Sequence, residues 1–504
     1  MSSSIVLGPL LGYELGDFYT VCILTDATVS DPKLTLTVGQ KKKTVPFKQK
    51  AVVGGNIFWR AEFKTSVGPT GVFQDYAIKH EAAPLADQHG RQAWRFYVPG
   101  RTEEPRIAYI SCNGFSSAKL ARDTDEPYAL WQRMQEEQQK SRPNTQPPPL
   151  SLMLFGGDQI YADEIWESRR CPTLQHWSEM TWAAQNKANE TVQMRKEVAA
   201  FYDWVYLDRW KDEHLSLMLA TVPSVMMWDD HDIFDGWGSY PEERQKCDVF
   251  KCVFVEAARV FDIFQMRCSA RSRLNPQTHR TFHLLFRDYH ILALDNRSER
   301  TGKQIMSEPH WVEFKACLAE IGKEPPKNLI ILSGMPVVYR SFATVEKLFE
   351  TTPWHEELED DVQDQWSATS HQAERIRLIM VLLNFLAEHP KVRCAILSGD
   401  VHVGALGRIW DEERELAITQ IISSGIVHPP PTVLGWMGIR LMTSDDPESL
   451  GEGAVKAQML TPTGSDRYLR IRNFVSFFTG TDGKLWFNWA CEDADLKPSF
   501  AASR

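Results

Sequence analysis

The chain has 504 residues and carries 66 acidic against 56 strongly basic side chains, a formal net charge of −10 at pH 7. This surplus of negative charge disfavours a protein whose main task is to hold nucleic acid or an anionic membrane, so no nucleic-acid scaffold role is expected. Hydrophobic residues make up 43% of the chain and aromatic residues 11%, which is enough for a large globular core.

The opening stretch MSSSIVLGPLLGYELGD has no basic residues ahead of its short apolar segment and no twin arginine, so it predicts no export signal. No run of about 18 apolar residues occurs, and no segment is therefore expected to span a membrane. The nine cysteines are scattered and form no CxxC pair, which is typical of reduced thiols. We therefore predict a soluble cytoplasmic protein of unspecified oligomeric state.

From residue 5 to residue 99 the chain alternates short β-type runs with turn residues. The runs are FYTVCILTD, KLTLTV, NIFWRAEFK and QAWRFYV. Evenly spaced short strands without a convincing helix predict a small antiparallel β-sandwich of the immunoglobulin or fibronectin type over residues 1–105. The three lysines at residues 41–43 are expected in a solvated turn of this domain.

After residue 105 apolar strands alternate with helices, which predicts an α/β domain over residues 106–504. The runs RIAYIS, SLMLF, SVMMW, HILAL, LIILSG and CAILSG are almost wholly apolar, as in strands covered on both faces. Helical stretches are expected at residues 198–220 and 375–389. The proline-rich stretch 135–150 is expected to be a surface loop, and two tail strands joined at the turn TDGK are expected to complete the sheet.

Polar residues collect directly after these apolar runs, where open α/β sheets bind their ligands. Four of the runs end in groups that bind cations, and a fifth delivers a carboxylate and two arginines. Crowded carboxylates repel one another and raise one another's pKa values, and a pair of bound metal ions would remove that cost. The residues are Cys112 and Asn113; Asp158, Tyr161 and Asp163; Asp229, Asp230, His231 and Asp232; Asp400 and His402; and Asp295, Arg297 and Arg300.

Each of these motifs alone has a structural explanation. The GD at Asp158 could be a simple turn, the run DDHD a helix cap with acids in its first turn, and Cys112 a small buried apolar residue. Asp400 and His402, two positions apart after a buried strand, are more specific because a tight loop can point them at adjacent metals. Together the motifs favour a metal site, and the mix of carboxylate, imidazole, phenol and thiol favours Fe, Zn or Mn over magnesium.

The stretches GGDQIYAD, MMWDDHDIFDGWGS and AILSGDVHVGALG, with SSGI after the last, resemble the motifs of the alkaline phosphatase D (PhoD-like) family of calcineurin-like metallophosphoesterases. The stretch DNRSERTGKQIMSEPHWVEF is similar to a further family segment, although His310 stands where a glutamine is expected. The resemblance spans about residues 106–431. It implies a four-layer αββα sandwich preceded by the small all-β domain.

The resemblance also implies a two-metal phosphoesterase site. Asp158 would bridge both metals, and Tyr161 and Cys112 would bind iron as phenolate and thiolate. The implied cofactors are two or more metal ions, ferric iron with Ca²⁺ first and Zn²⁺ or Mn²⁺ as alternatives. The implied metal ligands are Cys112, Asp158, Tyr161, Asp230, Asp400 and His402.

For catalysis, the resemblance implies that a metal-bound hydroxide attacks phosphorus while His231 protonates the leaving group or stabilises the phosphoryl oxygen. Arg297 or Arg300 would clamp the phosphoryl oxygens. The implied partner is a small-molecule phosphate ester, either a monoester or a diester. The alternatives are a nucleotide or phospholipid phosphodiesterase on the same scaffold, or a non-catalytic binding protein.

Some features depart from the family pattern. Met335, in SGMPVVY, stands where most metallophosphoesterases supply a histidine after the penultimate strand, and nothing nearby replaces it. His428, in SSGIVHPPP, is expected either near the site or on the surface. Asp163 is expected to start a helix or to support a ligand from behind. Two insertions, residues 242–273 and 346–366, are expected to cover the cleft.

Overall fold

The computed structural model describes residues 4–39, 41–143, 147–339, 366, 368–432, 436, 446–451 and 454–502. Within these ranges the strands form two large sheets and one smaller sheet. The expected insertion at residues 346–366 lies outside the described residues except for Trp366, whereas the insertion at residues 242–273 forms two helices.

The first large sheet has ten strands among the described residues, and its centre is built from the predicted apolar runs. Strands β10, β11 and β12 run parallel there, and the tail strands extend the sheet next to β10. In spatial order the strands are β24 (Ser499–Ala502), β23 (Leu485–Cys491), β22 (Asn473–Thr479), β10 (Arg106–Ile110), β11 (Leu150–Gly156), β12 (Ser224–Met227), β1 (Ile5–Glu14), β2 (Phe18–Thr25), β6 (Asn56–Lys64) and β5 (Lys48–Val53).

The second large sheet has nine strands within the described part of the chain, four of them parallel in the order β14, β15, β16, β18. The remaining strands pair antiparallel at its two edges. In spatial order the strands are β13 (Phe282–Phe286), β14 (Tyr289–Ala293), β15 (Asn328–Leu332), β16 (Arg393–Ser398), β18 (Leu416–Ile422), β17 (Gly404–Asp411), β20 (Val455–Leu460) and β19 (Glu448–Ser449), with β21 (Tyr468–Leu469) pairing to β17.

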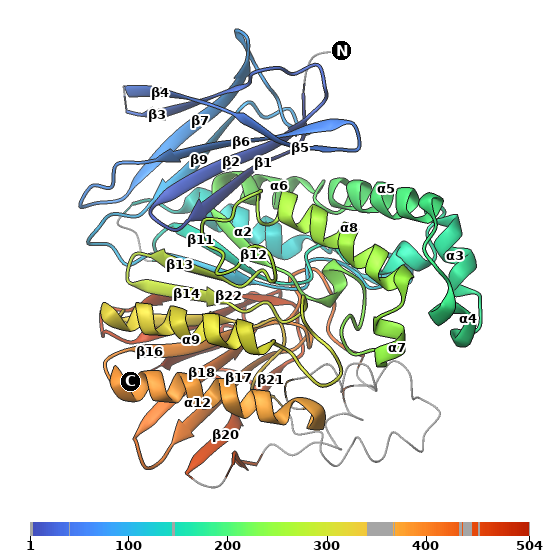
Figure 1. Cartoon of the computed structure of the whole chain (residues 1–504). Helices are drawn as coiled ribbons and strands as arrows, with labels where there is room; N and C mark the ends of the chain where they lie inside the picture. Colours follow the sequence, from blue (N-terminus) through green and yellow to red (C-terminus); the bar gives the residue numbers. More distant parts are fainter. Residues whose placement is uncertain are drawn as a thin grey trace.

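The two large sheets pack face to face, and helices cover their outer faces (Figure 1). Helices α5 and α8 lie over the first sheet, while α9 and α12 lie over the second. The predicted four-layer αββα sandwich is therefore confirmed. The helices are α1 (Ala118–Asp123), α2 (Ala129–Lys140), α3 (Pro172–Ser178), α4 (Trp182–Lys187), α5 (Val192–Arg209), α6 (Glu213–Thr221), α7 (Glu242–Gln245), α8 (Asp248–Phe264), α9 (Glu308–Lys323) and α12 (Gln372–Glu388), with 3₁₀ turns η1 (Asp163–Trp166), η2 (Asp230–Asp232) and η3 (Thr369–His371).

The layers follow from the alternation of side chains along each strand. In β10, Ile107 and Tyr109 belong to the apolar core between the sheets, whereas Ala108 and Ile110 belong to the core under the helices. Both faces of the strand are buried, as the continuous apolar runs predict. The expected helix at residues 198–220 is divided into α5 and α6 because Asp212 caps the second helix by accepting from two backbone N–H groups.

The N-terminal strands form two sheets, but one of them is continuous with the first large sheet. Strand β1 lies parallel to β12, with Gly12 opposite Ser224, and β2, β6 and β5 follow it. The facing sheet contains β4 (Lys41–Pro46), β3 (Lys33–Val38), β7 (Val72–His80), β8 (Ala83–Pro84) and β9 (Ala93–Val98). A domain boundary at residue 105 stays a prediction.

The prediction of a turn at residues 41–43 is wrong. These lysines lie on the exposed edge strand β4, which pairs with β3 along its whole length. Lysines on an edge strand discourage pairing with another chain, so their charge serves the sheet edge rather than a turn.

We predict that a fragment beginning at residue 106 does not fold into soluble protein. The fragment lacks β1, so one edge of β12 would be unpaired. It also lacks Tyr76, whose hydroxyl donates to the Ala220 carbonyl at 2.6 Å in the full chain. Size-exclusion chromatography of the purified fragment should show aggregates. A monodisperse fragment with a sharp thermal transition would instead show that the N-terminal strands are an independent unit.

Candidate metal-binding site

The polar residues that follow the parallel strands of both sheets meet at one place. The Cys112 thiol, after β10, lies 3.5 Å from a carboxylate oxygen of Asp158, which follows β11. One carboxylate oxygen from each of Asp158, Asp229 and Asp230 lies within 4.8 Å of the other two. The second sheet contributes Asp400, after β16, and the loop after β14. The sequence therefore predicts correctly that strand ends bring these acids together.

Arg297, from the loop after β14, joins the acids of the two sheets. Its guanidinium makes a close ion pair with Asp229, and its Nη2 lies 3.3 Å from Asp230 Oδ1 and 4.0 Å from Asp400 Oδ1. Its Nη1 donates to the Trp237 carbonyl at 3.0 Å. Arg297 is 0% exposed, so its charge acts inside the acid cluster.

The backbone at five of the predicted ligands is left-handed. Positive φ values are uncommon for residues other than glycine and cost about 1–3 kcal/mol when the surroundings must impose them. Such strain collects where a strand end must turn to point a side chain at a shared centre. The values are 51° at Cys112, 58° at Asp158, 48° at Tyr161, 68° at Asp400 and 51° at His402.

Two glycines allow the strand ends to close on Asp229. Gly157 has φ +106°, and a Cβ on it would lie 2.5 Å from the Asp229 Cβ. A Cβ on Gly334, just after β15, would collide with the Asp229 carboxylate. Gly334 precedes Met335, which stands where a histidine is expected from the family pattern. The backbone at this point therefore makes room for the Asp229 carboxylate.

Burial and crowding make this cluster unfavourable without added positive charge. Desolvation, followed by the charges of Asp229 and Asp230, raises the pKa of Asp158 well above its ordinary value. Desolvation and the nearby acids likewise raise the pKa of the Cys112 thiol and of the Tyr161 phenol. Asp158 Oδ1 is buried and has no hydrogen-bond partner among the described residues. The donor set therefore fits a bound cation.

The residues of the run DDHD have different hydrogen-bond partners. Asp230 joins the cluster, and its Oδ2 accepts from the Gly236 N–H at 2.9 Å. Asp232 instead accepts from the N–H groups of Asp158 at 2.8 Å and Asp229 at 3.0 Å. Burial raises the pKa of Asp232 to about 6 despite these bonds. Asp229 is the N-cap of η2 and Asp232 accepts from its backbone N–H as the third residue of a capping box, so the expected capping role is present in this run.

His231 is held by a carboxylate from a different motif. Its Nδ1 lies 2.9 Å from Asp163 Oδ2, and its ring stacks on Tyr161 with centroids 4.3 Å apart. Burial alone would lower the pKa of His231, but Asp163 and Asp230 hold it well above its ordinary value. Asp163 also starts η1, so both roles expected for it are present.

An aromatic wall of imidazole and phenol rings completes the site. The Tyr161 hydroxyl lies 3.1 Å from His402 Nε2, and the His428 ring stacks on His402 with centroids 3.6 Å apart. Burial lowers the pKa of His428 to about 3 and that of His402 well below its ordinary value. The structure places His428 near the site at 7% exposure, so the surface alternative is wrong.

Arg300 and Met335 contact each other. Arg300 Nη1 donates to the Met335 sulfur at 3.2 Å, and both side chains are buried. Met335 thus serves as a hydrogen-bond acceptor for an arginine at the position where a metal-binding histidine is missing. A role for Arg300 on the phosphoryl group stays a prediction.

Sequence reasoning did not single out Asp229, although it stands in the DDHD run beside Asp230. Nothing in the local spacing distinguishes the two acids, because the residues that enclose Asp229, namely Gly157, Arg297 and Gly334, come from distant parts of the chain. For Asp163, in GGDQIYAD, the sequence predicts a helix start or a supporting role but does not identify His231 as its partner.

The fold and the site define the class: a metallophosphoesterase sandwich with buried acids at the carboxyl ends of its strands. The family model described as PhoD related phosphatase matches residues 82–356 and 353–448. The chain therefore belongs to the PhoD related phosphatase family and is a metal-dependent phosphoesterase. Among the described residues, no helix is both long and apolar enough to cross a membrane. The cytoplasmic location stays a prediction.

Two solved structures agree with the fold, and one curated protein is similar in sequence. An uncharacterized protein of Saccharomyces cerevisiae, YGR266W, is 26% identical over an alignment of 536 positions that covers 85% of this chain and 74% of the yeast protein. The structure of PhoD is similar with a TM-score of 0.62 at 13% identity, covering 100% of this chain and 90% of PhoD. Purple acid phosphatase PPD1 from yellow lupin (Lupinus luteus) seeds has a TM-score of 0.54 at 12% identity, covering 98% and 74%.

We predict that metal addition stabilises the metal-free protein through Asp158. At a free metal concentration of 100 times Kd, binding to the folded state alone adds about 2.7 kcal/mol to the free energy of unfolding. Differential scanning calorimetry with Mn²⁺, Zn²⁺ or Ca²⁺ should show a higher Tm for the wild type but not for Asp158→Asn. The matched control Asp411→Asn alters a buried carboxylate paired to Arg414 and should keep the full gain. An equal gain in Asp158→Asn would contradict the assignment.

Proposed function

We propose that this phosphatase uses a two-metal centre to hydrolyse small-molecule phosphate monoesters or diesters. The observation that carries the proposal is the convergence on one buried place of Cys112 and three carboxylates from the first large sheet with Arg297 and Asp400 from the second. A protein that only binds its ligand would be expected to have lost some of these groups, so the intact set supports catalysis.

The chain's own donors suit transition metals. We assign Cys112, Asp158, Tyr161, Asp230, Asp400 and His402 as ligands and add Asp229 to them. Thiolate and phenolate donors favour ferric iron, with Ca²⁺ as its partner and Zn²⁺ or Mn²⁺ as alternatives. When bound, such ions polarise a phosphoryl oxygen and make hydroxide available near neutral pH. Neutral His402, with its lowered pKa, is in the form that can donate a lone pair.

His231 is the proposed general acid. Asp163 accepts from its Nδ1 at 2.9 Å, which fixes the ring and turns Nε2 toward the exposed side of the site, where Asp235 lies 3.9 Å away. A protonated imidazole in this position can pass a proton to the oxygen of the departing alcohol. The Arg297 guanidinium lies close to Asp230 and Asp400 and offsets part of their negative charge. The cluster therefore repels the anionic phosphoryl group of a substrate less strongly.

We predict hydrolysis of p-nitrophenyl phosphate or bis-p-nitrophenyl phosphate that stops when the metal is chelated and returns when it is restored. His231→Ala should lower kcat on methyl phosphate by about 10²–10⁴-fold, the usual contribution of general-acid catalysis, and much less on p-nitrophenyl phosphate, whose leaving group needs no proton. His290→Ala changes a half-buried histidine whose ring partner is His283, outside the site, and should leave the rate unchanged. Absence of hydrolysis of both esters with every added metal would overturn the proposed activity.

We predict that Asp163→Asn lowers kcat most on esters with poor leaving groups. An alkyl phosphate needs a proton on its leaving oxygen, whereas p-nitrophenolate leaves without one. The kcat of Asp163→Asn should therefore fall at least about tenfold more on methyl phosphate than on p-nitrophenyl phosphate. Asp235→Asn, which alters the exposed neighbour of the same imidazole, is the control and should show no such difference. Equal losses on both esters would show that Asp163 does not act through proton donation.

A further inference from the structure

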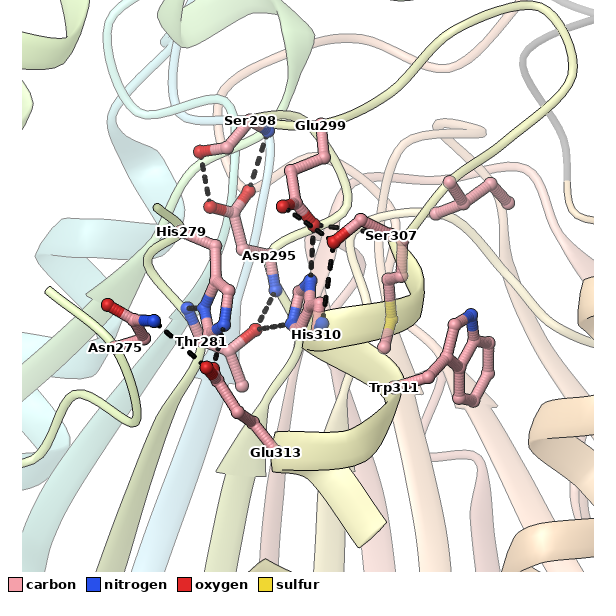
Figure 2. Close-up of polar contacts among 12 residues, drawn as sticks. Asn275, His279, Thr281, Asp295, Ser298, Glu299, Ser307, His310, Trp311 and Glu313 are labelled. Atoms are coloured by element: carbon pink, nitrogen blue, oxygen red, sulfur yellow. Dashed lines mark hydrogen bonds and ion pairs between the residues drawn. The ribbon is translucent and has the colours of Figure 1, made fainter. Parts of the chain in front are cut away.

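The loop that carries Arg297 is tied into a closed ring of hydrogen bonds behind the acid cluster. The loop, residues 295–300, follows β14 and leads toward α9. Figure 2 shows Asp295 of this loop bonded to Thr281, and Glu299 of the same loop bonded to His310. None of these side chains was assigned a role by the sequence motifs.

Asp295 anchors the start of the loop. Its Oδ1 accepts from the Arg297 N–H and the Ser298 N–H at 3.0 Å each, and from Trp228 Nε1 at 2.8 Å. Its Oδ2 accepts from the Arg280 N–H at 2.6 Å and from the Ser298 hydroxyl. Burial would raise the pKa of Asp295, but Arg280 and these bonds lower it to about 2. The anchor therefore stays ionised and connects the loop to the residue that precedes Asp229.

The donors of the ring can be assigned in order. The Glu299 carboxylate can only accept, so His310 Nδ1 carries a ring proton and donates to Glu299 Oε2 at 3.0 Å. With one ring proton on Nδ1, His310 Nε2 accepts from the Thr281 hydroxyl at 2.6 Å, and Thr281 Oγ1 accepts in turn from the Asp295 N–H at 2.8 Å. Glu299 lies four residues after Asp295 on the same loop. The hydrogen bonds and the loop backbone thus form one closed circuit.

Glu299 also connects the circuit to α9. Its Oε2 accepts from the Ser307 N–H at 3.1 Å and its Oε1 from the Ser307 hydroxyl at 2.8 Å, while Ser307 caps α9. Burial would raise the pKa of Glu299, but the hydrogen bonds from His310 and Ser307 hold it below its ordinary value. The loop is therefore held at its second end by a rigid helix rather than by solvent.

A second histidine and carboxylate lie beside the ring but outside it. His279 stacks on His310 with ring centroids 3.6 Å apart and pairs with Glu313 at 2.7 Å. Glu313 also accepts from Asn275 at 2.9 Å (Figure 2). Both imidazoles are 1% exposed, but the side chain of His279 does not bond to residues 295–300 among the described contacts. Its Nδ1 accepts from the Thr281 backbone N–H at 3.3 Å and does not contact the Thr281 hydroxyl that closes the ring. His279 is therefore an internal control for His310, because its loss leaves every hydrogen bond of the ring in place.

We propose that Thr281, His310 and Glu299 are positioning residues that set the direction of the Arg297 guanidinium against Asp229 and Asp230. This inference rests on the proposed function only for its effect on catalysis. The guanidinium fork meets three carboxylates and one carbonyl, so a small rotation of the loop would break several contacts together. Misplacement by about 1 Å of a group at a reacting centre can cost about 100-fold in rate.

The test compares His310→Leu, His310→Gln and His279→Leu. Leucine cannot close the ring, whereas glutamine can accept from Thr281 with its carbonyl and donate to Glu299 with its amide. Hydrogen exchange of the peptide 294–300, read by mass spectrometry, should be about tenfold faster in His310→Leu than in the wild type. It should stay unchanged in His310→Gln and His279→Leu. This readout does not require activity, so it decides the inference even if the wild type hydrolyses no phosphate ester.

The catalytic part of the test is a double-mutant cycle with Arg297→Lys, which keeps the charge but not the fork. With the wild-type arginine, His310→Leu should lower kcat/KM about 10- to 100-fold. In the Arg297→Lys background the same change should cost less than about twofold. Unchanged loop exchange, equal losses for His310→Leu and His279→Leu, or equal costs in the two backgrounds would each overturn the proposal.

Discussion

Carboxylates buried close together repel one another, and this repulsion is the constraint on which the rest of the site depends. Asp158, Asp229 and Asp230 lie within reach of one another at 1%, 1% and 4% exposure. The chain places Arg297 among them as a fixed cation and leaves the buried Oδ1 of Asp158 for further positive charge. Three features keep these charges together against that repulsion. They are the left-handed backbone at the strand ends, the glycines packed against Asp229, and the closed ring of hydrogen bonds that holds the Arg297 loop.

The two-sheet scaffold makes such crowding possible. Strands β10, β11 and β12 bring residues of the cluster from one sheet and β16 brings Asp400 from the other, and the bridge between Ser111 and Gly425 joins the sheets beside Cys112. Because each strand is apolar on both faces, the core fixes where its last residue points. The N-terminal strands extend the same sheet through β1, which pairs with β12. They therefore support the strand that leads directly into residues 228–231.

The elements and the polar motifs at the strand ends could be predicted from the sequence because they depend on local patterns. Continuous apolar runs identified β10, β11, β12 and β16, and the polar residues directly after them identified Asp158 and Asp400. Partners brought together by tertiary packing could not be predicted. Asp163 meets His231 across 68 residues, and Thr281 meets His310 across 29. The same limit explains why Asp229 was not distinguished from its neighbour in the chain.

The central claim is that these strand ends form a two-metal site, and metal stoichiometry tests it most directly. Protein expressed with available iron, manganese, zinc and calcium, then purified without chelator, should contain about two metal ions per chain by elemental analysis. Asp158→Asn, folded by circular dichroism, should contain fewer than one. Wild-type protein without bound metal, or a variant with the same content as the wild type, would contradict the account.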